Sequence, residues 1–226
     1  THAATAIENA RLFEEETRRT SIIETLVDIA NEIATTQDII PVLDKITLRA
    51  MELLHANHVA IYLLHDDNHT LKVIAAQGVH RQELLLQSVK IGEGITGSVA
   101  ASGKPEIIEL VARDRRRVHL AGTPESDADR ETMMSSPLIL RGKCIGTVNA
   151  WRLRTNGVFS QVELSFLTSI ANQVSVAIES SNLFKETVRR AQESAAIAEV
   201  GRDISATLQL DVVLNRIATY AKELLN

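Results

Sequence analysis

Residues 89–105 decide how the rest of this chain is interpreted. They read Val-Lys-Ile-Gly-Glu-Gly-Ile-Thr-Gly-Ser-Val-Ala-Ala-Ser-Gly-Lys-Pro. The start predicts a short strand, the glycines predict a tight turn, and the small residues that follow predict a short helix. Gly103 and Pro105 are residue types at which helices commonly stop. The stretch therefore predicts a strand, a turn and a helix of about two turns.

Three glycines of this stretch, Gly92, Gly94 and Gly97, spell the G-x-G-x-x-G pattern of dinucleotide-binding proteins. That pattern binds a pyrophosphate at the first turn of a parallel strand–helix–strand unit, with a full helix behind it. Here the predicted helix is too short, and the neighbouring strands belong to hairpins. We therefore interpret Gly92 and Gly94 as turn residues that need positive φ, and Gly97 as a point of close helix-to-sheet packing.

Two predicted hairpins flank the glycine turn. The β-strand period of two occurs at residues 59–64 and 71–76, and again at 136–140 and 144–151, each pair joined by a polar turn. Helical patterns precede the strands at 3–19, from Ile23 to Ile33 and at 38–56, where Asp38 is the expected N-cap. Consecutive hairpins predict an antiparallel sheet covered by helices, which is an α+β fold.

A long helix is also predicted at the C-terminal side, with Ser160 as its N-cap and a continuation past residue 184. Long helices are therefore expected to extend from the sheet at both ends.

The two ends of the chain repeat each other. Residues 1–55 align with residues 172–226 without gaps, and 17 of these 55 positions are identical. A repeat of this kind indicates a tandem array. It predicts the end of an upstream connector helix at 1–21, one complete domain at 22–184, and a connector helix with the first helices of a following repeat at 185–226.

Apolar residues in both terminal segments recur at the alternating three- and four-residue spacing of a helix–helix seam. They are Ile23, Leu26, Ala30 and Ile33 in the first segment, and Ile197, Val200, Ile204 and Leu208 in the second. Such short seams allow two interpretations, a face packed on the chain's own domain or a coiled-coil contact in a homodimer. Because the pattern returns in both repeats, we expect the dimer.

Composition excludes several partners. The net charge of −5, with aromatic residues at 3% and no basic stripe, argues against nucleic-acid binding. The single cysteine, Cys144, allows no internal disulfide and is typical of a reducing compartment. No apolar run approaches the ~18 residues of a membrane span. We expect a cytoplasmic location, while a membrane anchor elsewhere in a longer parent protein stays open.

The chain offers little for catalysis. Its seven histidines are scattered without the spacing of metal ligands. It contains no P-loop, G-x-S-x-G motif, kinase motif or paired carboxylates. We expect no metal site and no catalytic residues, which favours a regulatory domain over an enzyme.

Taken together, the motifs resemble the GAF domain family of small-molecule sensors. The resemblance covers residues 22–184 and is carried by residues 89–97, Gly103-Lys104-Pro105, residues 135–138 and 145–149, Phe159-Ser160, residues 170–173 and 177–179. It implies a six-stranded antiparallel sheet with the terminal helices on one face and a ligand pocket on the other. It also implies tandem units joined by continuous helices, upstream of effectors such as cyclases or the histidine kinases of two-component systems.

The motifs of several GAF subclasses are missing. Cyclic-nucleotide binders carry Asn-Lys where this chain has Asn149-Ala150, and bilin binders use a cysteine followed by histidine, whereas Cys144 precedes Ile145. Members that reduce methionine sulfoxide use several cysteines, and no motif supports haem. The resemblance therefore leaves the ligand, and any cofactor, unidentified.

Two functions follow from the resemblance. In the first, a small molecule enters between the sheet and residues 109–135, with Thr96, Arg130, Ser135 and Ser136 as polar contacts. Closure of that segment then shifts the terminal helices, which relay the signal to a downstream effector in the same chain. In the second, the pocket holds no ligand and the module only dimerises and transmits helix motion.

Overall fold

The computed structural model describes residues 39–119, 122, 130–207 and 215. The helices predicted before residue 38, with Ile23, Leu26, Ala30 and Ile33, lie outside the described residues, as do Asp38 and Leu208. The chain divides into two compact units between Ser181 and Asn182, and each is described by itself.

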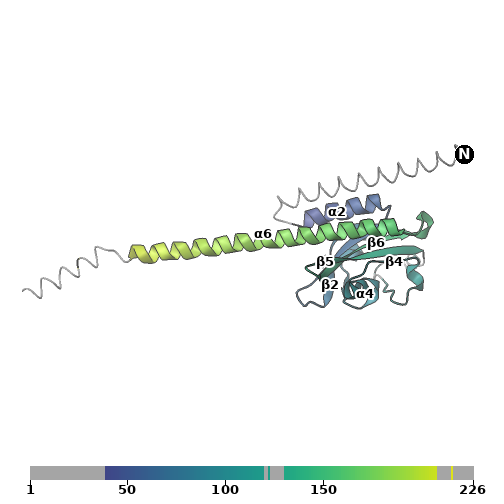
Figure 1. The fold of residues 1–226 in the computed structure, drawn as a ribbon, viewed down its shortest axis with the longest axis horizontal. Coiled ribbons are helices and arrows are strands. Elements are labelled where there is room, and N and C mark those ends of the chain that lie inside the picture. The colour runs from purple at the N-terminus through teal and green to yellow at the C-terminus, as the bar shows by residue number, and fades with distance from the viewer. Residues whose placement is uncertain (1–38, 120–121, 123–129, 208–214, 216–226) are drawn as a thin grey trace, which may run out of the picture. The chain divides into compact units, whose positions relative to one another are not determined.

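One antiparallel sheet of six strands, in the order β3-β2-β1-β6-β5-β4, forms the centre of the first unit (Figure 1). The strands are β1 His58–Leu64, β2 Thr70–Gly78, β3 Ser88–Lys90, β4 Glu106–Ile108, β5 Glu131–Leu140 and β6 Lys143–Leu153. Both predicted hairpins are present, as β1–β2 and β5–β6. The predicted α+β class and the six-stranded antiparallel sheet are confirmed.

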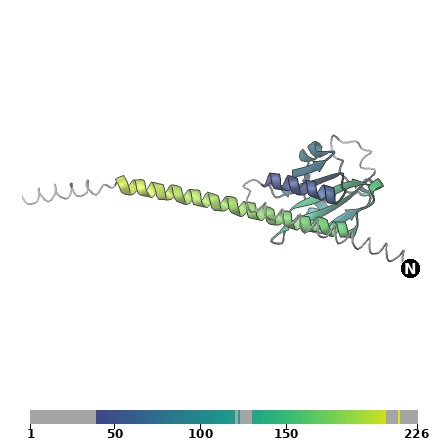
Figure 2. The ribbon, with the colours of Figure 1, turned by 90° about the horizontal axis from the view of Figure 1, so that it is seen from above.

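Helices cover both faces of this sheet. Figures 1 and 2 show α2 (Ile40–Leu53) and the first part of α6 (Gln161–Thr207) over one face, where α2 and the α6 residues from Leu164 to Ile178 contribute to a single apolar core. The other face carries α3 (Arg81–Leu85) and α4 (Gly94–Ser102), which share a second cluster with β1 and β2. Two short 3₁₀ turns, η1 (Val111–Arg113) and η2 (Arg154–Asn156), complete the unit.

Strand alternation decides which side chains reach which face. Val59 and Ile61 of β1 pack in the core beneath α2 and α6, whereas Ala60 and Tyr62 belong to the cluster on the opposite face. This is the expected result of a period of two in a strand covered on both sides. The central strands therefore present two separate sets of residues, and only one set can line a site beneath α4.

Helix α2 begins at Ile40, one residue later than an N-cap at Asp38 would predict. Ile39 occupies the N-cap position without a side-chain hydrogen bond, and Pro41 lies in the first turn. Proline suits this position because its missing N–H would have no partner inside the helix. The start predicted from Asp38 is therefore corrected, while the predicted apolar face is present, with Val42, Leu43, Ile46 and Ala50 buried.

Arg152 of β6 joins both helices on the covered face. Its guanidinium donates to both carboxylate oxygens of Glu163 in the first turn of α6, at 3.0 and 3.3 Å, and to the carbonyl of Leu54 at the end of α2, at 3.1 Å. It also donates to the carbonyls of Gly157 and Val158 and lies 4.1 Å from the ring centroid of Phe159. The Arg152 and Glu163 side chains are only 6% and 9% exposed.

Two reciprocal hydrogen bonds between Ser160 and Glu163 cap the N-terminus of α6. The Glu163 N–H donates to Ser160 Oγ at 3.3 Å, and the Ser160 N–H donates to the Glu163 carboxylate at 2.8 Å. This capping box confirms Ser160 as the predicted cap. Burial would raise the pKa of Glu163, but the hydrogen bonds from Ser160 and Arg152 outweigh it and hold that pKa below its ordinary value.

The second unit contains the continuation of α6 up to Thr207. Several large apolar residues are exposed there, namely Leu183, Phe184, Val188, Ile197 and Val200. Ile204 lies in the helix, but its side chain is not described. Within the described residues, no helix is both long enough and apolar enough to span a membrane.

We predict that Arg152→Met lowers the free energy of unfolding by about 3–5 kcal/mol, because it leaves the Glu163 carboxylate and three carbonyls without their shared buried donor. Urea denaturation followed by circular dichroism measures this loss. Arg49→Met is the matched control, since the Arg49–Glu52 pair on α2 is exposed at 65% and 50% and its loss should cost less than about 1 kcal/mol. Equal effects of the two changes would contradict the role given to Arg152.

Candidate ligand pocket

A cavity of about 90 Å³ lies on the sheet face that α2 and α6 leave uncovered. Its floor comes from the three central strands, through His58 and Tyr62 of β1, Glu131 and Met133 of β5, and Trp151 of β6. The sheet register explains the grouping, because Trp151 pairs with His58 on one side and with Met133 on the other. Residues from distant parts of the chain thus meet at one end of the sheet.

The cover of the cavity comes from shorter elements. Leu84 of α3, Gln87, Val89 of β3, Val111 of η1, the first residues of α4 (Gly94, Ile95 and Thr96) and the loop residues Val118 and His119 line it. Most of these side chains are apolar, so the cavity combines an apolar cover with a more polar floor. Such a lining is typical of small-molecule sites.

A buried acid–base pair forms the polar part of the floor. His58 Nε2 lies 2.9 Å from Glu131 Oε1, and the two side chains are 8% and 11% exposed. A carboxylate only accepts hydrogen bonds, so Nε2 carries the shared proton. His58 Nδ1 is buried and has no hydrogen-bond partner among the described residues. The imidazole also lies close to two other rings, 5.3 Å from His80 and 5.7 Å from Trp151 between centroids.

Two further polar groups of the lining are held by hydrogen bonds. The Tyr62 hydroxyl donates to Gln87 Oε1, and complete burial raises the pKa of Tyr62 so that the phenol stays neutral. Thr96 Oγ1 accepts from Asn149 Nδ2 at 3.0 Å, while Asn149 Oδ1 accepts from Ser135 Oγ at 2.6 Å. This chain of bonds ties the start of α4 to strands β5 and β6.

The four residues expected to contact a ligand do not come together. Thr96 lines the cavity, and Ser135 lies behind it in the chain through Asn149. Ser136 lies on the opposite face of the sheet, where it donates to Thr168 Oγ1 of α6 at 3.2 Å. Arg130 is exposed, and its carbonyl accepts a hydrogen bond from the N–H of Arg154.

The glycine turn has the geometry expected of a structural turn. Gly92 and Gly94 have φ values of 86° and 65°. A Cβ on Gly97 would lie 2.2 Å from the carbonyl oxygen of Lys90, so only glycine fits there. The turn also uses its own amides, because the Gly92 N–H donates to Gly97 O at 2.8 Å and the Gly97 N–H to Glu93 O at 3.0 Å. Amides bonded in this way are not available to a phosphate group.

The residues that sequence reasoning missed are His58, Tyr62, Glu131 and Trp151. A signal existed for two of them, because His58 and Tyr62 occupy the same alternate positions of β1 as Ala60. Polar side chains at these alternate positions must face the side of the sheet away from α2. Glu131 gave no comparable signal, since it lay outside the segments predicted as strands.

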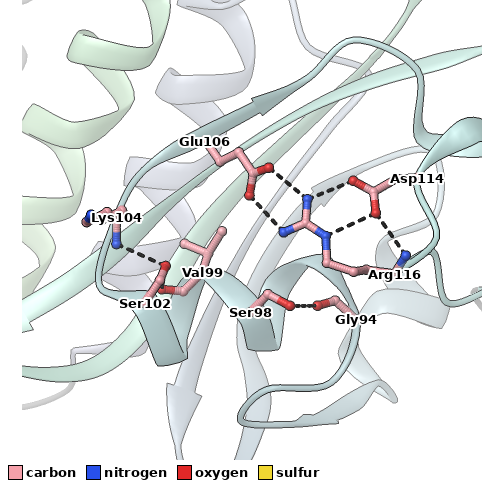
Figure 3. Close-up of polar contacts among 8 residues, drawn as sticks. All are labelled: Gly94, Ser98, Val99, Ser102, Lys104, Glu106, Asp114 and Arg116. Atoms are coloured by element: carbon pink, nitrogen blue, oxygen red, sulfur yellow. Dashed lines mark hydrogen bonds and ion pairs between the residues drawn. The ribbon is translucent and has the colours of Figure 1, made fainter.

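Segment 114–118, which leads into the cavity lining, is fastened by Arg116 (Figure 3). The Arg116 guanidinium donates to both carboxylate oxygens of Glu106 on β4, at 2.7 and 3.0 Å. It also donates to both carboxylate oxygens of Asp114, at 2.7 and 3.0 Å. These bonds hold the pKa of Asp114 below its ordinary value and raise that of Arg116. Three charges thus clamp the segment to the edge of the sheet.

The clamped segment reaches the start of α4. A Cβ on Gly94 would lie 3.1 Å from a methyl group of Val118 and 3.6 Å from the Arg116 carbonyl. Val118 and His119 continue from the clamp into the cavity lining. The position of this wall therefore depends on the three-residue clamp of Arg116, Glu106 and Asp114.

Neither thiol nor metal chemistry is indicated at the cavity. Cys144 is half-buried on β6, and burial raises the pKa of its thiol despite a hydrogen bond to the Gly146 carbonyl. No group of three or more His, Cys, Asp or Glu side chains in the described part of the chain is arranged to hold a metal ion.

Comparison with known proteins identifies the architecture. A family model described as GAF domain matches residues 36–179. The Nif-specific regulatory proteins of Azospirillum brasilense and Azospirillum lipoferum are each 24% identical over 73% of this chain, and the chain spans less than a third of their length, 29% and 28%.

Solved structures share the fold at low sequence identity. The GAF domain of a phosphoenolpyruvate-protein phosphotransferase from Acinetobacter is 22% identical with a TM-score of 0.61, over 71% of this chain and 94% of its own. The corresponding domain from Coxiella burnetii is 19% identical with a TM-score of 0.62, over 73% and 96%. The free methionine-R-sulfoxide reductase of Neisseria meningitidis, solved with its substrate, is 20% identical with a TM-score of 0.59, over 72% and 90%.

We predict that Arg116→Gln loosens the cavity wall. Without the guanidinium, Asp114 and Glu106 repel each other, and amide hydrogen exchange at residues 117–119 should rise about three- to fivefold, as expected for partly exposed ion pairs. Exchange measured by mass spectrometry tests this. Arg115→Gln is the control, because it removes the same charge from the exposed neighbouring residue. If both variants raise exchange equally, net charge rather than the clamp sets the position of the wall.

Proposed function

This chain belongs to the GAF domain family, and we propose that it is a regulatory module that senses a small molecule and relays the signal through its terminal helices. The cavity between the central strands and α4 is the observation that carries this proposal. GAF domains are regulatory modules of signalling proteins, and the similarity to two regulatory proteins supports the same role here. The effector in the parent protein, such as a histidine kinase or a cyclase, is part of the proposal.

The relay is proposed to pass through β6. Trp151 lines the cavity, and the next residue, Arg152, holds Glu163 in the first turn of α6 on the opposite face. A ligand that moves this end of β6 changes both contacts at once, because adjacent residues of a strand share one backbone. The displacement is then carried along α6, which is continuous from Gln161 to Thr207.

A regulatory rather than catalytic role is supported by the chemistry of the cavity. The only cysteine of the chain, Cys144, does not line it, and burial of the thiol disfavours the reactive thiolate. The alternative function is a ligand-free module for dimerisation and helix relay. The small size of the cavity favours that alternative, so ligand binding is the decisive measurement.

We predict that at least one member of a small-molecule library raises the melting temperature and changes the fluorescence of Trp151, the only tryptophan of the chain. A ligand at a hundredfold excess over its Kd stabilises the folded state by about 2.7 kcal/mol. Native mass spectrometry measures the bound mass.

Two variants, each of which replaces a valine with the larger phenylalanine, form a matched pair. Val89→Phe inside the lining should abolish the response, whereas Val162→Phe on the exposed start of α6 should keep it. A library without any binder, at concentrations up to millimolar, would favour the ligand-free module.

Dimerisation through the terminal helices is the second part of the proposal. The second unit exposes Phe184, Ile197 and Val200 at 49%, 73% and 58%, and exposed apolar side chains at helical spacing are typical of helix–helix contacts. A second copy of the chain is the partner that the repeated seam pattern favours. Contact between two α6 helices would bring two modules to a common output.

We predict a concentration-dependent dimer in sedimentation equilibrium, weakened at least tenfold by the double change Phe184→Glu and Ile197→Glu, because charges would be buried in the contact. Gln192→Glu, on the same exposed helix, is the control and should leave the dimer unchanged. A wild-type chain that stays monomeric at tens of micromolar would contradict this part of the proposal.

A further inference from the structure

We infer that the cavity takes a small uncharged molecule whose polar group both donates and accepts hydrogen bonds, as a primary amide does, and that it discriminates against carboxylates and phosphates. This inference rests on the proposed sensing function and names the chemical class of its ligand. It is argued from the charge, the hydrogen-bonding groups and the size of the lining.

The charge of the lining disfavours an anion. Glu131 is the acidic residue of the lining, and neither Lys nor Arg occurs among the described residues that form it. Arg116, two residues before Val118 of the lining, is engaged by Glu106 and Asp114 at the edge of the sheet. A carboxylate or phosphate in this cavity would lose its hydration without a cation to replace it. It would also meet the Glu131 carboxylate within the same cavity.

A cation is disfavoured for a different reason. The Glu131 carboxylate already shares a proton with His58 Nε2, so part of its accepting capacity is used. The cavity is also lined by Gly94, Ile95 and Thr96 at the N-terminus of α4, where the helix dipole places partial positive charge. The same dipole attracts the oxygen of a neutral carbonyl. An uncharged group with a carbonyl oxygen and an N–H therefore suits both the helix end and the acceptors of the floor.

The remaining polar groups agree with a neutral ligand. Tyr62 stays protonated because burial raises its pKa, and its hydroxyl hydrogen is bonded to Gln87. The amide nitrogen of Gln87 can therefore donate to a ligand oxygen. The rest of the lining, including Val89, Ile95 and Met133, offers apolar contact to a short hydrocarbon body.

The volume limits the size of the ligand. A cavity of about 90 Å³ holds the equivalent of about three water molecules and is smaller than the ~150 Å³ cavity that binds benzene in an engineered protein. Because Val118 of the lining is 58% exposed, the cavity opens to solvent on that side. A branched molecule of about six non-hydrogen atoms fills the cavity and extends into this opening. Isobutyramide, isobutyrate and isobutyramidine meet this limit, share one shape and differ in charge.

The test is a titration of the full 226-residue chain with each of these three probes, followed by the indole N–H signal of Trp151 in nitrogen-15 NMR spectra. We expect isobutyramide to shift this signal with at least about tenfold higher affinity than isobutyrate or isobutyramidine. The titration is run at about pH 8, above the range in which histidine side chains ordinarily titrate.

Variants at the rim separate charge from shape. Val118 lines the cavity but is 58% exposed, so a substitution there does not disturb the core. Val118→Lys should raise the affinity for isobutyrate about tenfold, and Val118→Gln should not. Glu131→Gln keeps an acceptor for His58 and should reduce the discrimination between isobutyramide and isobutyrate.

Tighter binding of isobutyrate or isobutyramidine than of isobutyramide overturns the proposed ligand class but leaves the sensing function intact. Absence of any Trp151 response to the three probes also overturns the proposed class, in its size and polarity. The sensing function itself fails only if the wider library yields no binder that Val89→Phe abolishes. The two failures are therefore distinguishable.

Discussion

The buried guanidinium of Arg152 is the interaction on which the arrangement of this module depends. A charge with 6% of its side chain exposed is tolerated only where acceptors surround it. Three carbonyls and the Glu163 carboxylate do so here, because the end of α2, the loop after β6 and the first turn of α6 converge on one residue. These contacts fix where α2 ends and where α6 begins above the sheet. Moving either helix therefore leaves a buried charge or a buried carbonyl without its partner.

Because successive side chains of a strand point to opposite faces, the contacts of Arg152 lie next to the cavity along β6. Trp151 and Arg152 are neighbours in β6, yet one lines the cavity and the other holds α6. Ser135 and Ser136 divide in the same way on β5, toward Asn149 and toward Thr168. The cavity and α6 are thus separated by the thickness of a single sheet. A register shift of one residue would exchange the two sets, and the antiparallel pairing of β1, β6 and β5 prevents this.

Local features of the fold could be predicted from the sequence, whereas most of the residues that line the cavity could not. The glycine turn, the two hairpins and the Ser160–Glu163 capping box each involve residues close together in the chain. His58 and Glu131 lie 73 residues apart and meet only through the order of the strands. The four expected contacts include Ser135 and Ser136, which are neighbours in one strand and therefore face opposite sides of the sheet. This alternation places Ser136 among the residues beneath α6, and it was available from the predicted strand itself.

The small cavity also limits how the module can switch. A ligand of about six non-hydrogen atoms binds with at most about 9 kcal/mol, at the ceiling of about 1.5 kcal/mol per atom. Changing a population from 1:99 to 99:1 needs about 5.5 kcal/mol of differential binding. Most of the ligand's interactions would then have to exist in one state only, and the part that moves must be inexpensive to displace. The buried Arg152 contacts do not meet this condition. The clamp of Arg116 with Glu106 and Asp114 does, because Arg116 and Glu106 are 35% and 39% exposed and water replaces part of what is lost when it opens. In the proposed relay, the wall made by residues 114–119, rather than the helix end held by Arg152, is therefore the element that a ligand would move first, and the Arg152 contacts would transmit the change without breaking.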